Sequence, residues 1–223
     1  MSFLDELKEN TRSDDIVNEL LRQREELWES IINKCVAWCY HKIKDSIMES
    51  AKKGDFQDAD GKKLIEGEIA AVGIEKLPSS KQNNLFRENG IEPIGDFYPK
   101  AIIKSTEMIT ETRTKKAFLC FNRKYKVSRY IYTFAFTDDT VVFLKKLNEL
   151  AKADNVELTG VTIWWNSKLS DDFHPCPIYL DDVFSSDINT YTYEKIYDFD
   201  TMELTYSTHL RDSLVGIKYR VLY

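Results

Sequence analysis

The first fifty residues carry apolar side chains at the three- and four-residue spacing of an α-helix. No glycine or proline occurs before Gly54, which has the position of a helix-ending glycine after two lysines. Ser13 is expected to cap a helix over residues 13–53, and a short helix is expected at 3–9, with an interruption at 10–13. The stripe comprises Val17, Leu20, Leu21, Leu27, Trp28, Ile31, Ile32, Cys35, Cys39, Ile43 and Ile47.

A helix over residues 13–53 would be about 55–60 Å long, which exceeds the diameter of a small domain. Its apolar stripe is wider than the seam of a coiled coil, and Arg24, Lys34 and Lys42 interrupt any regular heptad. We therefore expect the helix to pack on the protein's own sheet. Because the helix is longer than a small domain, it could also pack against a second copy of the chain in a homodimer.

After residue 54 the pattern changes to β-branched and aromatic residues, in places with a period of two. A helix is expected from a cap at Thr137 or Asp138 to Ala153, and loops are expected around Pro175 and Pro177. The core face of this helix should comprise Phe143, Leu144, Leu147, Leu150 and Ala151. Strands are expected at 63–75, 102–109, 117–121, 127–136, 156–165, 191–197 and 214–222, with a hairpin at 122–124 and a short helix ending near Phe86.

These elements predict an α+β fold in which a long N-terminal helix packs on a largely antiparallel sheet. Residues 116–165 should form a strand-strand-helix-strand unit. Residues 1–54 form the helical element and residues 55–223 the α+β body, and we expect the two to make one structural unit. The chain is 43% hydrophobic and 13% aromatic, which is too rich in core-forming residues for a disordered protein.

The net charge of −6 and the pI of about 5.3 argue against a nucleic-acid binder that uses its whole surface. The N-terminus lacks the basic and apolar regions of a signal peptide, and no apolar run reaches the length of a membrane span. We therefore expect a cytoplasmic protein with no membrane association.

Basic and aromatic residues are interleaved between residues 113 and 132, and no acidic residue occurs from 113 to 129. A β-ribbon of this composition can bind phosphates with its cations and stack bases on its rings. The alternative is a solvated hairpin whose rings face the core. The candidates for binding phosphate or nucleic acid are Arg113, Lys115, Lys116, Arg123, Lys124, Lys126, Arg129, Tyr125 and Tyr130.

Residues 170–205 have the opposite charge, with nine acidic residues and a single basic one, Lys195. This segment could complement the basic stretch inside the fold, dock on a basic partner, or bind a divalent cation in a metal-dependent hydrolase. Its acidic pairs, however, lie in turn-like sequence, where aspartate is common for local reasons.

Cys35, Cys39, His174 and Cys176 have the composition of a Cys₃His zinc site, but their spacing matches no zinc finger or ribbon. Cys35 and Cys39 also fall within the apolar stripe, so core cysteines are the favoured interpretation. No nucleophile motif and no phosphate-binding glycine loop occurs. We expect no cofactor, and the balance is against an enzyme.

Residues 1–12, which begin Met1-Ser2-Phe3-Leu4-Asp5, resemble the start of uncharacterised small proteins of low-GC Gram-positive bacteria and their prophages. The resemblance implies no activity, but it favours a phage-linked accessory role, such as an inhibitor of a host system. The leading hypothesis is a non-enzymatic protein that binds a protein partner. A binder of nucleic acid or nucleotide, and then a metal-dependent hydrolase, are the alternatives.

Overall fold

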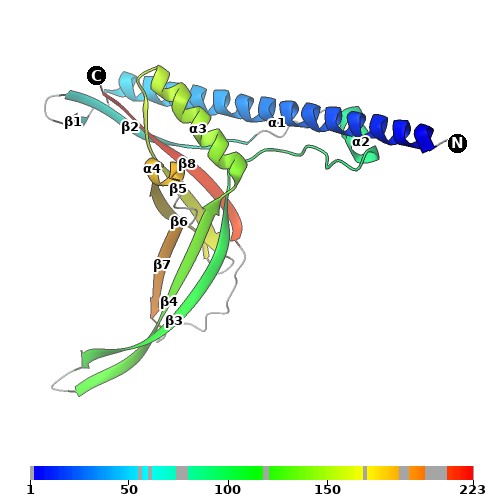
Figure 1. Ribbon diagram of the computed structural model, residues 1–223. Coiled ribbons are helices and arrows are strands. Elements are labelled where there is room, and N and C mark those ends of the chain that lie inside the picture. Colours follow the sequence, from blue (N-terminus) through cyan, green and yellow to red (C-terminus); the bar gives the residue numbers. More distant parts are fainter. Residues whose placement is uncertain are drawn as a thin grey trace.

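The computed structural model describes residues 3–54, 57–59, 62–73, 80–117, 121–167, 170–185, 191–198 and 210–222. In this part of the chain, the fold is α+β, with a long N-terminal helix and two antiparallel sheets, as the sequence predicts. The helix lies across one end of the molecule and the sheets extend away from it (Figure 1).

Helix α1 (Phe3–Lys53) is continuous, so the predicted interruption at residues 10–13 and the cap at Ser13 are wrong. At 1.5 Å per residue, α1 is about 75 Å long. The polar residues of the expected break each cost only some tenths of a kcal/mol in helix propensity. Ending and restarting the helix would instead leave several backbone groups without partners. The predicted C-terminal end is confirmed, because Gly54 follows with a φ of 73°.

The apolar stripe of α1 is covered along most of its described length. Helix α3 (Asp138–Ala153) crosses its middle, and α2 (Ser80–Glu88) lies beside its N-terminal half (Figure 1). Arg24 Nε donates to the carbonyl of Glu92 at 2.8 Å, which ties the segment after α2 to the helix. The rest of the fold therefore packs along α1 and covers most of the described apolar stripe. The buried side chains of the stripe are Leu20, Ile31, Ile32, Cys35, Val36, Cys39, Tyr40 and Ile43.

The larger sheet has the strand order β1-β2-β8-β5-β6, and every neighbouring pair is antiparallel. Its strands are β1 (Gln57–Ala59), β2 (Lys62–Ala70), β5 (Glu157–Ser167), β6 (Ser170–Tyr179) and β8 (Leu210–Leu222). Strand β2 ends at Ala70, earlier than predicted, and residues 74–79 lie outside the described part. Strand β6 replaces the loop predicted around its two prolines, and the short helix α4 (Leu180–Phe184) follows it.

One contact joins this sheet to α1. Tyr219 of β8 lies directly opposite Gly67 of β2, and a Cβ on Gly67 would lie 2.4 Å from the Tyr219 hydroxyl oxygen. The Tyr219 ring thus occupies the space that a side chain at position 67 would need. The Tyr219 hydroxyl donates to Ser46 Oγ of α1 at 2.6 Å, so the buried ring also carries a polar link to the helix.

The smaller sheet has the order β3-β4-β7, with β3 (Ala101–Ala117), β4 (Phe121–Phe136) and β7 (Tyr191–Asp198). The predicted order of strand, strand, helix and strand is confirmed, but its first strand and its hairpin were predicted at the wrong places. The strand predicted at 117–121 is wrong, because Ala117 ends β3 and Phe121 begins β4. Residues 122–124 belong to β4, and the chain reverses between residues 117 and 121. Thr137 caps α3 by accepting a hydrogen bond from the Thr140 amide, and β4 and β5, on either side of α3, lie in different sheets.

Candidate functional site

The two long strands β3 and β4 form a ribbon that projects from the rest of the molecule (Figure 1). Strand β7 pairs with β4 only from Val127 to Phe134. Beyond that point the described part of the ribbon has two strands, and we call residues 112–117 and 121–126 the ribbon tip. At about 3.3 Å per residue, the tip extends roughly 20 Å beyond β7.

A break in register lies at the base of the ribbon. Ile103 pairs with Phe134 and Ser105 pairs with Thr133, which leaves Lys104 as an extra residue in β3. Such a bulge bends a strand and increases its local twist. From Ser105 to Ala117 the register then runs without interruption, so the ribbon keeps one geometry to its tip.

Six basic residues and no acidic residue lie in the ribbon tip of this acidic protein. The side chains of Lys115, Arg123, Lys124 and Lys126 are exposed, and that of Arg113 is 43% exposed. This concentrates positive charge on a narrow, solvated projection. The side chain of Lys116 lies outside the described part of the structure.

The tip carries cations on both of its faces. Arg113 lies opposite Tyr125, and Lys115 lies opposite Arg123, which places these four residues on one face, the arginine face. On the other side, Thr112 lies opposite Lys126 and Thr114 lies opposite Lys124. This second face, the lysine face, also includes Asn122 at the position opposite Lys116.

The neutral members of the lysine face, Thr112, Thr114 and Asn122, are not among the residues that the sequence predicted for this site. Placing the hairpin at 122–124 had assigned part of this face to a turn. The signal that could have found the two threonines is the alternation of threonine with charged residues from Thr110 to Lys115, which has the period of two of a strand.

The acidic residue nearest to the tip in β3 is Glu111. Its carboxylate lies 3.4 Å from Arg113 Nη2, and both side chains are partly exposed. An exposed pair of this kind stabilises a fold by at most about 1 kcal/mol. Among the described residues, no carboxylate forms an ion pair with Lys115, Lys124 or Lys126.

The acidic segment meets the ribbon at its root. Glu194 and Asp198 of β7 pair in register with Ile131 and Val127 of β4. Arg129 and Tyr130 lie in this three-stranded part, where they pair with β7, and their side chains are outside the described set. The other described acidic residues of the segment lie in the larger sheet or in α4. The ribbon tip therefore extends past the only acidic strand placed beside it in the described structure.

The cysteine candidates lie inside the fold. Cys35 and Cys39 have no exposed surface, and Cys35 Sγ donates to the Val72 carbonyl at 2.7 Å. The neighbouring thiol is the main cause of both shifts, which raise the pKa of Cys35 and lower that of Cys39. Burial raises the pKa of Cys176 in β6. The described residues contain no cluster of three potential metal ligands, and the His174 side chain is not among them.

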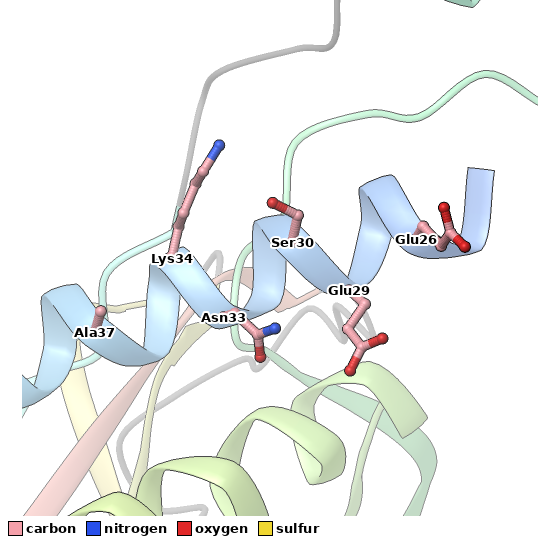
Figure 2. A pocket seen from close by; sticks show the side chains of 6 residues that line it. All are labelled: Glu26, Glu29, Ser30, Asn33, Lys34 and Ala37. Atoms are coloured by element: carbon pink, nitrogen blue, oxygen red, sulfur yellow. The ribbon is translucent and has the colours of Figure 1, made fainter. Parts of the chain in front are cut away.

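One open hollow of about 390 Å³ lies along α1, lined by Glu26, Glu29, Ser30, Asn33, Lys34 and Ala37. Figure 2 shows Glu29 and Asn33 pointing toward α3, with Ser30 and Lys34 pointing away from it. Lys146 of α3 binds Glu29 at 2.7 Å and Asn33 at 2.9 Å, so these polar groups already have partners. The hollow is thus an open surface of α1, and two of its polar side chains are already engaged by α3.

No helix in the described part of the chain is both long enough and apolar enough to cross a membrane. Comparison of the chain with protein-family models, with curated proteins and with solved structures gives no match in any of the three.

Proposed function

We propose that this chain is a non-enzymatic binding protein that holds nucleic acid with its ribbon tip. The observation that supports this proposal most is the projection of a two-stranded, cationic ribbon beyond the acidic strand β7. The phosphate backbone of nucleic acid is a dense anionic partner for such a surface, and neutralising its phosphates releases condensed counterions.

The shape of the tip favours nucleic acid over an acidic protein surface. A protein interface of standard size buries about 800 Å² on each partner and has an apolar centre. The described side chains of the tip are polar apart from Tyr125, which is half-buried. Contacts made through charge alone suit a phosphate backbone, whose binding is dominated by electrostatics.

The test is a charge reversal with a matched control. The variant Lys115→Glu/Arg123→Glu/Lys124→Glu should lose binding to fluorescently labelled DNA of 20 nucleotides per strand, tested as a single strand and as a duplex by polarisation in 50 mM salt. Wild-type binding should weaken steeply by 200 mM salt. The control, Lys34→Glu/Lys81→Glu/Lys145→Glu, changes the net charge equally at exposed sites on the helices and should keep wild-type affinity.

Circular dichroism and the melting temperature would show that both variants fold. If the wild-type protein binds neither single-stranded nor duplex DNA in 50 mM salt, the proposal is wrong. If the control variant loses affinity as much as the tip variant, binding depends on net charge and the ribbon is not the site.

A further inference from the structure

We infer that the ribbon tip enters the major groove of duplex DNA, with the cations on both of its faces reaching phosphates. This inference rests on the proposed function and specifies its ligand. It follows from the register of β3 and β4, which divides the described cations of the tip between two faces.

The division of charge between the faces distinguishes a groove from a flat ligand. Arg113, Lys115 and Arg123 belong to the arginine face, and Lys124 and Lys126 belong to the lysine face. A single strand, or any other one-sided anionic surface, contacts one face of a ribbon. Cations on the opposite face are then held away from the ligand by the thickness of the ribbon. This distance is a large part of the Debye length of about 8–10 Å, so salt screens much of their attraction. A groove has phosphate walls on both sides, so both sets of cations contribute.

The dimensions of the tip also fit this site. The major groove of B-form DNA is about 12 Å wide and admits a two-stranded β-ribbon, whereas the minor groove is about 6 Å wide. A tip of roughly 20 Å follows about half of a 34–36 Å helical turn. Duplex RNA does not offer an equivalent site, because its major groove is deep and narrow.

The residues of the lysine face suit base edges as well as phosphates. Thr112 and Thr114 alternate along β3, are exposed, and lie opposite Lys126 and Lys124. Threonine can exchange a hydrogen bond with a base edge or contact the thymine methyl group in the major groove. The arginine face instead offers two guanidinium groups, which bind phosphate in a bidentate manner.

The experiment compares two variants that remove equal charge from opposite faces. Lys115→Gln/Arg123→Gln neutralises two cations of the arginine face, and Lys124→Gln/Lys126→Gln neutralises two of the lysine face. Affinity is measured for a 20-base-pair DNA duplex, one of its strands alone, and a duplex RNA of the same sequence. Each variant should weaken duplex binding roughly 10- to 100-fold in 100 mM salt and reduce the slope of log Kd against log salt by about 1.8.

Wild-type protein should prefer duplex DNA to both other ligands, and it should protect guanine N7, which lies in the major groove, from methylation. Tight single-strand binding, an effect confined to one face, or an unprotected N7 would each overturn the groove assignment while leaving the proposed function intact. Loss of binding to every nucleic acid would overturn both. The variant Lys34→Gln/Lys145→Gln, with two charges removed from the helices, should match the wild type.

Discussion

At the scale of single residues, one charged cluster fastens α1 to the end of α3. The Tyr40 hydroxyl donates to Asp154 Oδ2 at 2.5 Å, and Lys44 Nζ lies 2.6 Å from the same oxygen. Lys44 and then Tyr40 hold the pKa of Asp154 below its ordinary value of 3.8. The carboxylate form is therefore favoured in the folded protein more than in the unfolded chain.

We predict that this cluster stabilises the fold in a pH-dependent way. Because the pKa of Asp154 is lowered on folding, its contribution is complete above the unfolded value and disappears as the pH falls through the folded value. Asp154→Asn should lower the melting temperature at pH 6–7, and the difference from wild type should shrink below about pH 4. Thermal melts of both proteins from pH 7 to pH 2.5 measure this difference in melting temperature.

Lys44→Gln should show the same convergence at low pH, because Lys44 is the main cause of the shift. A wild-type advantage that stays constant down to pH 2.5 would mean that ionisation of Asp154 plays no part.

The sequence predicted the centre of each apolar stripe better than its borders. Ile31, Cys39 and Ile43 of α1 are buried, and so are Leu144 and Leu147 of α3. Two residues that the spacing had placed on these core faces are exposed instead, Leu21 by 41% and Leu150 by 38%. Helical spacing locates a face to within about one residue, but the width that a neighbour covers depends on the packing angle, which a single sequence does not contain.

At the scale of elements, the ribbon tip was misread because neither of its faces is buried. A strand is recognised when one face enters the core and apolar residues alternate with polar ones. In the tip, the described side chains of both faces are exposed or half-buried and almost all polar, so their alternation carries no hydrophobic signal. Asn122, Arg123 and Lys124 then look like a turn, although they are paired residues of β4. The chemistry of the candidate site was predictable, but its two-sided geometry required the register.

Strand β6 is a second element that the sequence did not predict. Pro175 and Pro177 predicted a loop, yet both lie in an edge strand that pairs with β5 on one side. Proline is tolerated at a sheet edge, where its missing N–H faces away from the neighbouring strand. The two exposed prolines therefore deprive an incoming strand of donors, which protects this edge from pairing with another chain.

We predict that Pro175→Thr/Pro177→Thr promotes self-association. Restored N–H groups would give the β6 edge a regular pairing pattern for a second copy. Light scattering after size exclusion, over a range of concentrations, should show larger species for this variant than for the wild type. Replacing Thr112 and Thr114 by serine, in the ribbon, is the control and should leave the mass unchanged. Equal masses for the proline variant and the wild type would show that the prolines do not guard this edge.

At the scale of the whole molecule, α1 and both sheets share one core. Buried side chains of α1, such as Ile43, belong to the same apolar cluster as Phe134 of β4, Phe143 of α3 and Ile217 of β8. Within the described structure, the apolar core is not divided between residues 1–54 and the rest of the chain. The helical element and the α+β body should consequently depend on each other for stability.

We predict a single cooperative unfolding transition. Helix content followed by circular dichroism and tertiary structure followed by tryptophan fluorescence should give coincident denaturation curves. Phe143→Ala, which removes a fully buried ring, should lower the free energy of unfolding by about 3–5 kcal/mol and shift both curves together. Val142→Ala, at the neighbouring exposed position, should change it by less than about 0.5 kcal/mol. Curves that separate would divide the molecule into two units.

The place of β8 in the larger sheet has a consequence for how the protein is made. This strand lies between β2 and β5, although a ribosome synthesises it after every other described strand. Until it emerges, β2 and β5 each lack a neighbour, and the nascent chain exposes unpaired strand edges. Folding of this sheet must therefore wait for nearly the whole described chain, so the growing polypeptide carries two incomplete halves of the sheet until β8 is made.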